Sequence, residues 1–427
     1  MKLIQKFEIS CDDLPRLKIK MLNWLRQFGI FAYLDNNQYQ NLFNRYELLV
    51  GAGVQQIYSD PEAITAAFGK EWLFGHINYD FKNRLYQDLK SEHIAWFHNE
   101  ALQFFKPEIV LYLPYRSTEL HIESNALSPE IIFRQILDSE ARIDFESSGK
   151  PRFNRLWDKA QYIESVKTVK EHIRKGDCYE LNLCVGAVAS QTELDPFGCF
   201  AKLNQVNPAP FACMYRSGDF YALSSSPERF MAKDGRRLLA QPMKGTIRRS
   251  KNAAEDAQLK IQLKADEKER AENVMIADLM RNDLAKSCET GSVRVPELFE
   301  VYTFPTLHTM ISSVEGDLRK EVPPFTALLN AFPMGSMTGA PKKIVMELIE
   351  DLEQSKRELY AGCIGYSNPA GDFDFNVVIR TLLYHAQTKE LSYHTGGAIT
   401  IDSDPEKEWA EVWLKAQALE AIFNDRP

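Results

Sequence analysis

The stretch FACMYRSGDFYALS, residues 211–224, decides the fold. Phe211 to Arg216 and Phe220 to Ser224 are apolar, strand-forming runs, and Ser217-Gly218-Asp219 between them is typical of a turn. The stretch therefore predicts a hairpin of two antiparallel strands. Since single helices follow such strands further along the chain, we expect an α+β protein with mostly antiparallel sheets rather than a doubly wound parallel one.

Helices and strands are expected on both sides of this hairpin. Apolar residues recur at helical spacing from Ile163 to Ile173, and Gly176 then ends the pattern, which predicts a helix from Tyr162 to Lys175. The polar stretch from Glu146 to Arg155 is the best candidate for a boundary between two regions. Further helices are expected over residues 253–287, 341–354 and 405–423, and strands over 360–366, 373–384 and 391–394.

Composition limits the function. The chain has 427 residues, of which 44% are hydrophobic, with a net charge of −8. This charge argues against binding to nucleic acid or to an anionic membrane, because clustered Lys and Arg hold both. No apolar run is long enough to span a bilayer or to form a signal peptide, so we expect a cytoplasmic protein. Seven cysteines without a C-x-x-C pair are expected to be reduced thiols, and the histidines show no zinc spacing.

The segment Gln241-Pro242-Met243-Lys244-Gly245-Thr246 places one amine between a proline and a glycine. Both neighbours favour a sharp bend that presents Lys244 into a cleft. A lysine in a partly dry site loses its proton more easily and becomes a nucleophile. The alternative from these six residues alone is a solvated lysine in a turn.

Two pairs of glutamates have the spacing of one helix face. Glu269 and Glu272 lie three apart in one predicted helix, and Glu408 and Glu411 lie three apart in the last one. Each pair alone is most simply a solvated helix surface. If the two pairs converge, they form an anionic, all-oxygen site that suits Mg²⁺. The sequence alone does not establish this convergence.

Four further features carry candidate chemistry. Glu228 follows the hairpin directly and is either a surface ion-pair partner or, in a cleft with the lysine, a general acid. Arg380 interrupts an apolar run and is either paired internally or binds a substrate carboxylate. Gly335–Ala340 and Gly396–Ala398 are small-residue loops whose N–H groups suit an anion. His308 is most simply a buried core histidine.

Taken together, these segments resemble the chorismate-utilising enzymes, a family that includes anthranilate, aminodeoxychorismate, isochorismate and salicylate synthases. The resemblance covers nearly all of residues 155–424 and only loosely the first 145, around Asn36 and Arg45. It implies a sandwich fold, with a catalytic domain over 150–424 and an N-terminal region over 1–145 that contributes to the same sandwich. The matching segments are 176–183, 226–230, 242–246, 269–272 with 278–283, 308–316, 335–342, 365–366, 379–381 and 396–411.

Lys244 separates the branches of this family. Anthranilate synthases usually carry alanine there, and aminodeoxychorismate synthases carry lysine. The isochorismate and salicylate branch needs a lysine at the position of Glu180, which this chain lacks. The resemblance therefore implies conversion of chorismate and ammonia to 4-amino-4-deoxychorismate, for p-aminobenzoate and folate synthesis, through a covalent lysine intermediate. The alternatives are an anthranilate synthase component I and an inactive scaffold or ligand-binding subunit.

The resemblance also implies roles for single residues. Mg²⁺ is expected on Glu272 and Glu411, with Glu269 and Glu408 outside them through water. The implied catalytic residues are Lys244, Glu228 and His308, and the implied substrate-binding residues are Thr246, Thr338, Tyr366, Arg380, Gly397 and Ala398.

Two positions depart from the family pattern, and one activity is missing. Glu180 stands where related amino-transferring enzymes commonly have Gln, which leaves its role open, and Ala398 replaces a usual glycine. The chain carries no Gly-x-Cys-x-Gly glutaminase motif, so a separate glutamine amidotransferase is expected to supply ammonia. Some members of the family hold tryptophan in the N-terminal half, and the residues around Asn36 and Arg45 leave this open.

Overall fold

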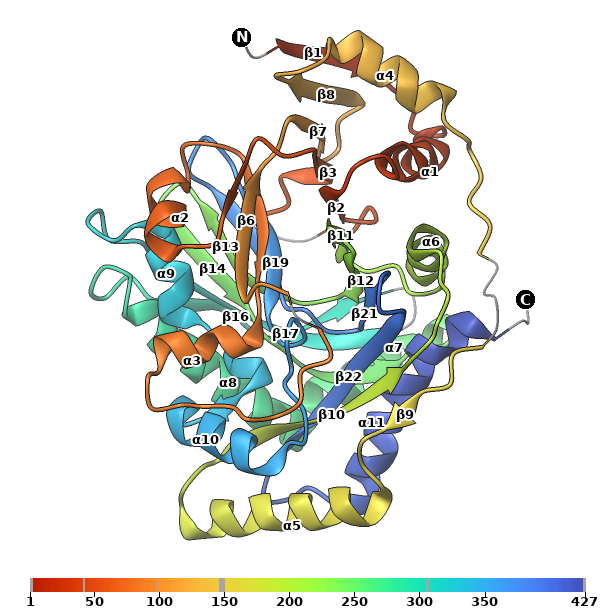
Figure 1. Ribbon diagram of the computed structural model, residues 1–427. Coiled ribbons are helices and arrows are strands. Elements are labelled where there is room, and N and C mark those ends of the chain that lie inside the picture. The colour runs from red at the N-terminus through yellow and green to blue at the C-terminus, as the bar shows by residue number, and fades with distance from the viewer. Residues whose placement is uncertain (1–2, 41–42, 98, 146–149, 305–306, 425–427) are drawn as a thin grey trace.

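The computed structural model describes residues 3–40, 43–97, 99–145, 150–304 and 307–424. Their strands form two large sheets (Figure 1), and the pairings within both sheets are antiparallel. The expected α+β class with mostly antiparallel sheets is confirmed. Most of the candidate boundary, residues 146–149, lies outside the described residues.

The first sheet joins strands from both halves of the chain. Its N-terminal and C-terminal parts meet where β2 pairs with β11, with Tyr33 opposite Met214. Along the sheet the order is β1 (Leu3–Glu8), β8 (Glu119–Ser124), β7 (Ile109–Pro114), β3 (Tyr46–Ala52), β2 (Ile30–Asp35), β11 (Phe211–Ser217), β12 (Phe220–Ser226), β21 (Thr381–His385), β22 (Glu390–Ile399), β10 (Glu180–Ala189) and β18 (Gly339–Ala340), with β9 (Asn154–Arg155) also on β10.

The second sheet mixes the two halves in the same way. Its N-terminal strands join the rest where β5 pairs with β19, with Gly75 opposite Gly365. Along the sheet the order is β15 (Met243–Arg248), β17 (Leu307–Asp317), β14 (Arg237–Gln241), β13 (Arg229–Asp234), β20 (Phe373–Asn376), β19 (Cys363–Ser367), β5 (Leu73–Ile77), β6 (Leu102–Lys106) and β4 (Gln56–Tyr58), with β16 (Arg294–Thr303) also on β17.

Helices cover the outer faces of both sheets. One core lies between the first sheet and its helices, a second lies between the second sheet and α8 and α9, and a third lies between the two sheets. The helices are α1 (Leu14–Leu25), α2 (Pro61–Ala67), α3 (Lys82–Leu85), α4 (Pro129–Asp138), α5 (Lys159–Lys175), α6 (Pro196–Val206), α7 (Ala253–Ala265), α8 (Glu267–Ala285), α9 (Pro324–Ala331), α10 (Lys342–Leu352) and α11 (Pro405–Glu420), with short 3₁₀ turns η1 (Tyr79–Phe81), η2 (Gly335–Met337) and η3 (Ala421–Phe423).

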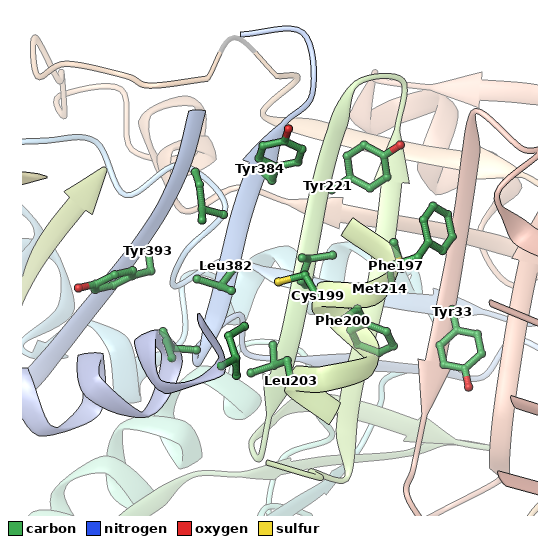
Figure 2. Close-up of a cluster of buried hydrophobic side chains, with 14 of the residues drawn as sticks. Tyr33, Phe197, Cys199, Phe200, Leu203, Met214, Tyr221, Leu382, Tyr384 and Tyr393 are labelled. Carbon is green, nitrogen blue, oxygen red and sulfur yellow. The ribbon is translucent and has the colours of Figure 1, made fainter. Parts of the chain in front are cut away.

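The predicted hairpin is present as β11 and β12, at the centre of this arrangement. Alternate residues of a strand face opposite sides, so Tyr221 and Leu223 pack under α6 while Ala222 packs toward the second sheet. Figure 2 shows Tyr221 beside Phe197 of α6. Residues on both faces of this hairpin are therefore buried, as its apolar composition requires.

Two expected elements are interrupted. The helix expected over 253–287 breaks at Asp266, whose backbone is extended. Asp266 is the N-cap of α8, and its side chain accepts a hydrogen bond from the N–H of Glu269. The strand expected over 373–384 is two strands in different sheets, β20 and β21, because the chain crosses between the sheets there. The helix predicted to end at Gly176 is confirmed as α5, and Gly176 has a φ of 84°.

Within the described ranges, the structure contains no helix with the length and apolar character needed to cross a bilayer.

Candidate active site

Lys244 lies on β15, at one end of the second sheet. The register of β15 with β17 shifts between Lys244 and Thr246, so Gly245 forms a bulge with a φ of 78°. The expected sharp bend is therefore a bulged strand. Lys244 Nζ lies 2.6 Å from Oε1 of Glu180, and the lysine side chain is only 11% exposed. Lys244 is not a solvated turn residue.

The charge on Lys244 is set by its neighbours. Burial acts to lower the pKa of Lys244, as the sequence suggested, but the carboxylates of Glu180, Glu272 and Glu228 outweigh burial and raise that pKa above its ordinary value. The expectation that this lysine loses its proton more easily is therefore wrong for the resting site. As a cation it needs a base before it can act as a nucleophile.

Glu180 is held at the first position of β10. It pairs with Ala340 of β18, and the next residue of β18, Gly339, approaches so closely that a Cβ there would lie 2.0 Å from the carbonyl oxygen of Glu180. The Glu180 side chain is 1% exposed, and its second oxygen, Oε2, has no hydrogen-bond partner within the described ranges. The close backbone packing fixes this carboxylate beside the lysine.

Glu228 is a buried acid on the connection between β12 and β13. Burial raises the pKa of Glu228 to about 7, although a 2.7 Å hydrogen bond from Ser336 and the positive charges of Lys244 and Arg380 oppose the rise. A carboxyl group with this pKa is partly protonated at neutral pH and suits general acid catalysis. Sequence analysis missed Ser336, although it lies in the small-residue segment expected to bind an anion.

The carboxylates of α8 and α11 converge. Nζ of Lys268 lies 3.7 Å from Glu272 and 3.9 Å from Glu408, which brings the two helices to one place. Burial raises the pKa of Glu272 to about 7 and also raises the pKa values of Glu269 and Glu408. Oε1 of Glu272 has no hydrogen-bond partner among the residues described. A buried carboxylate oxygen that accepts no hydrogen bond from the described part of the chain, and has a cation 3.7 Å away, is suited to a metal ion.

Glu411 differs from the other three glutamates. Lys415 lies 2.9 Å from it and holds its pKa below the ordinary value. Within the described ranges, no three His, Cys, Asp or Glu side chains are arranged to hold a metal ion together. Mg²⁺ takes only one or two protein carboxylates plus waters and substrate oxygens, so a closed cage is not required. Glu272 and Glu411 therefore fit this ion chemically.

Arg380 lies where the chain crosses from β20 to β21, and its φ is 51°. Burial lowers the pKa of Arg380, although Tyr39 and Glu228 oppose this shift. No described carboxylate lies within ion-pair distance of its guanidinium. A half-buried arginine without such a partner favours the interpretation that Arg380 binds a substrate carboxylate.

The small-residue segment at Gly397 and Ala398 is not a loop. Both residues lie within β22, where they pair with Leu183 and Asn182 of β10. A Cβ at Gly397 would lie 3.3 Å from Oε2 of Glu408. The small residues therefore let β22 pass close to the glutamates of α11, and part of their backbone hydrogen bonding belongs to the sheet.

Three other predicted residues lie in different surroundings. Thr338 is buried and donates its hydroxyl to the carbonyl oxygen of Met334 at 3.1 Å. Thr246 is exposed on β15, beyond the bulge. His308 is buried on β17, with Nε2 3.1 Å from Oδ1 of Asp256 on α7. The roles given to these residues stay predictions.

Tyr366 does not join the site. On β19 it faces the core between the sheets, on the same side as Ile364, and its ring packs against Tyr46 and Trp72 with centroids 5.6 and 6.2 Å apart. It lines a cavity together with Arg45. The prediction that Tyr366 binds the same ligand as Lys244 is therefore corrected, because strand alternation turns it to another cavity.

A buried ion pair behind the site also escaped sequence analysis. Arg357 donates to Glu353 at 2.6 Å and to the carbonyl oxygens of Met337 and Asn182 at 2.6 and 2.8 Å. Glu353 in turn accepts the N–H of Cys184 at 2.8 Å. The pair ties β10 to η2, the elements that carry the carboxylate beside the lysine and the serine beside the acid. An i, i+4 Glu–Arg pair is common on solvated helices, so the sequence contained no signal for this role.

Comparison with known proteins identifies the family. A family model described as chorismate binding enzyme matches residues 35–421. The chain belongs to this family. Among curated chorismate-related proteins, the chloroplastic aminodeoxychorismate synthase of Arabidopsis thaliana is 42% identical over 288 residues, which are 67% of this chain and 31% of the plant protein. Aminodeoxychorismate synthase component 1 of Escherichia coli is 39% identical over 259 residues, which are 61% of this chain and 56% of that protein.

The fold of this chorismate binding family member also matches a solved structure. Anthranilate synthase component I from Streptococcus pneumoniae superposes with a TM-score of 0.74 at 23% identity, over 98% of this chain and 92% of that one. This likeness confirms the expected fold. The matched part of the plant relative is about a third of its length, and that of the bacterial relative is just over half.

Proposed function

We propose that this chain is component I of an aminodeoxychorismate synthase, which converts chorismate and ammonia to 4-amino-4-deoxychorismate. The observation that carries the proposal is the largely buried Lys244, whose charge interacts with Glu228, an acid with a pKa of about 7, in a member of the chorismate binding family. The relatives from A. thaliana and E. coli, which bear this name, support it. The product serves p-aminobenzoate and folate synthesis.

The proposed reaction uses the side chains in named roles. Lys244 attacks carbon 2 of the ring, and Glu228 gives its proton to the hydroxyl group that leaves carbon 4 as water. Ammonia then adds at carbon 4, and the bond between carbon 2 and the lysine breaks. The guanidinium of Arg380, which has no ion-pair partner among the described residues, holds a substrate carboxylate. Covalent catalysis divides one hard displacement into two easier ones.

We propose Mg²⁺ as the cofactor, held by Glu272 and Glu411 with Glu269 and Glu408 further out. Oε1 of Glu272, which is buried and accepts no hydrogen bond from the described residues, supports this assignment. Bound there, Mg²⁺ offsets the negative charge of a substrate carboxylate. The glutamates bind and orient, while the proton and bond changes stay with the lysine and Glu228.

A separate glutamine amidotransferase is the proposed source of ammonia. The lack of a Gly-x-Cys-x-Gly motif in the sequence supports this partner. All seven cysteines are free and six of them are buried, which fits a reducing compartment such as the cytoplasm.

Product analysis tests the function. The purified chain is incubated with chorismate, an ammonium salt and Mg²⁺, and the products are separated by chromatography. Aminodeoxychorismate is the expected product. Anthranilate would place the chain in the anthranilate synthase branch, and the absence of turnover would indicate an inactive scaffold.

Lys244→Ala tests the covalent step. This change removes the nucleophile and leaves Arg380 and the glutamates in place, so product formation should fall by at least about 100-fold while chorismate still binds. The measurement combines steady-state rates with chorismate titration. Intact-mass analysis of the wild type during turnover should locate an adduct on Lys244, and an adduct on another residue would contradict the assignment.

A further inference from the structure

One carboxylate touches the proposed nucleophile, and the reaction above gives it no role. Oε1 of Glu180 lies 2.6 Å from Nζ of Lys244, at hydrogen-bond distance from the reacting nitrogen. We propose that Glu180 is the base that takes a proton from Lys244 as the lysine attacks the ring and returns it when the lysine leaves. The inference rests on the proposed function and adds a catalytic residue to it.

The surroundings of Glu180 suit a proton acceptor. Its carboxylate is buried, and among the described residues the hydrogen-bond donor that reaches its side chain is Lys244. Its Oε2 has no partner within the described residues. Glu353 provides a contrast, because its two oxygens accept hydrogen bonds from Arg357 and from the N–H of Cys184. Glu353 is committed to structure, whereas Glu180 retains the capacity to accept a proton.

The other carboxylates around the lysine are committed to different tasks. Glu228 is hydrogen bonded to Ser336 and serves as the acid for the leaving hydroxyl group. Glu272 belongs to the converging pairs of α8 and α11 and lies 3.7 Å from Lys268. The ammonium group of Lys244 has to lose a proton before its nitrogen can attack, and Glu180 is the carboxylate that contacts this nitrogen, at 2.6 Å.

The proton and electron balance closes with this assignment. A hydrogen on Nζ of Lys244 moves to Glu180, and the freed electron pair forms the bond to carbon 2. The two ring double bonds shift by one position toward carbon 4, whose hydroxyl group leaves as water with the proton of Glu228. When ammonia adds at carbon 4, the double bonds shift back and the lysine leaves as an amine. Lys244 then regains its proton from Glu180, and the new ammonium group gives one to Glu228.

Glu180→Gln is the decisive variant, because glutamine keeps the shape and the hydrogen bond but accepts no proton. Related amino-transferring enzymes commonly carry Gln at this position, so the role proposed for Glu180 is particular to this chain, and those enzymes pass the proton of their nucleophile to another group. We expect kcat near neutral pH to fall by about 100-fold or more, with the KM for chorismate within about threefold of the wild-type value. The ratio of variant to wild-type kcat should rise toward alkaline pH, where solvent deprotonates the lysine, and taking this ratio cancels the change in free ammonia. The groups facing the lysine, Glu228 and Glu272, stay the same in both proteins.

Glu315→Gln is the matched control. Glu315 is another buried glutamate, on β17, and it pairs with Arg294 at 2.9 Å on a different part of that strand. The kcat of the Glu315→Gln variant should stay close to the wild-type value. Thermal unfolding and chorismate titration of all variants separate a catalytic loss from a folding defect.

Chemical rescue gives a second, independent readout. In Glu180→Ala, added formate should restore turnover in proportion to its concentration, because a small carboxylate can replace the missing base; a merely structural role would not respond. Suppose that Lys244→Ala is inactive, as expected. The inference about Glu180 is then overturned if Glu180→Gln keeps the wild-type kcat, or if formate does not restore the turnover of Glu180→Ala. If Lys244→Ala itself keeps full activity, the covalent step of the proposed function is wrong, and the role of Glu180 is overturned with it.

Discussion

Glu180 and Glu228 show how one side-chain type takes opposite tasks at one lysine. Glu228 is buried where desolvation raises its pKa to about 7, so it can hold a proton. Glu180 is buried as well, but it contacts Lys244 at 2.6 Å and faces the reacting nitrogen. Environments that separate two carboxyl groups in this way are typical of acid–base pairs in enzymes.

The residue-level signals in the sequence were partly sufficient. The Pro-Met-Lys-Gly context and the position after the hairpin singled out Lys244 and Glu228, because both signals are local. The charge state of Lys244 was predicted wrongly, because it depends on Glu180 and Glu272, which approach from other elements. Tyr366 was misplaced for a related reason, since the face of a strand is settled by tertiary packing.

We expect Glu228→Gln to lower kcat by about 100-fold or more, because an amide cannot donate the carboxyl proton, with chorismate binding retained. The same variant should change the pH dependence of stability. The folded-state pKa of Glu228, about 7, exceeds its ordinary value of 4.5, so between these values the folded protein holds a proton that the unfolded chain lacks. The stabilisation that this proton provides is fully present below the ordinary pKa of 4.5, and it is lost as the pH rises through the folded-state pKa of about 7.

Urea unfolding at about pH 5 and about pH 8 measures this effect. The free energy of unfolding of the wild type should fall relative to that of Glu228→Gln as pH rises. Other carboxyl groups with raised pKa values, such as those of Glu272 and Glu358, affect both proteins alike. An identical pH dependence in the two proteins would contradict the buried-acid assignment.

At the level of elements, the break between α7 and α8 helps to shape the site. The sequence has no Gly or Pro there, so a continuous helix was expected. Asp266 instead caps α8, and its side chain accepts the N–H of Glu269. This separate start gives α8 its own direction, along which Glu269 and Glu272 meet the glutamates of α11. An Asp followed three residues later by Glu resembles a capping box, and this was the available signal.

The converging helices lead to a prediction about metal. Glu272→Gln and Glu411→Gln should each raise the Mg²⁺ concentration needed for half-maximal activity by about tenfold or more, because a neutral amide is a poorer ligand for a hard cation. Glu269→Gln and Glu408→Gln should have smaller effects. Activity titrated with Mg²⁺ after treatment with a chelator measures this.

The metal titration has a matched control on the same helix. Glu406→Gln changes an exposed glutamate in the first turn of α11, which pairs with Lys159. It should leave the Mg²⁺ requirement unchanged. If Glu272→Gln and Glu411→Gln also leave it unchanged, these residues do not bind the ion.

The close contact between β18 and β10 leads to a prediction about Gly339. In Gly339→Ala, the new Cβ would meet the carbonyl oxygen of Glu180, and a φ of 141° is unfavourable for alanine. We expect a loss of stability of about 1–3 kcal/mol from backbone strain, and a lower kcat because Glu180 is displaced. Thermal unfolding and steady-state rates report the two effects.

Gly176→Ala serves as the comparison, because Gly176 also has a positive φ but nothing within 4 Å of its Cβ position. It should lose stability and keep kcat. Equal kcat values in the two variants would show that the approach of Gly339 does not position Glu180.

For the whole molecule, the sequence was sufficient for the fold class but not for the way the halves combine. Hairpin and helix signals are local, and they predicted an antiparallel α+β protein. The pairing of β2 with β11 and of β5 with β19 joins distant segments, which periodicity alone does not register. Convergence of the four glutamates depends on these long-range pairings as well, so their spacing could only suggest it.

The proposal that a separate amidotransferase supplies ammonia predicts which nitrogen sources this chain can use. Without a glutaminase nucleophile, the purified chain should use ammonium salts at elevated pH, where free ammonia is present, and should not turn over glutamine. Adding the matching amidotransferase should restore the use of glutamine. Product formation with each nitrogen source, with and without the partner, measures this. Turnover of glutamine by the chain alone would require a second active site in it.

The interleaved sheets have a consequence for biosynthesis. One edge of β5 pairs with β6, which is translated soon after it. The other edge pairs with β19, which leaves the ribosome about 290 residues after β5. At 5–20 residues per second, this wait is roughly 15–60 s. Throughout that time the nascent chain presents a bare strand edge at β5, and β2 presents one until its partner β11 is translated; such edges invite pairing with other chains. The same pairings that complete the sandwich thus make the growing chain dependent on protection from aggregation until its last third has been translated.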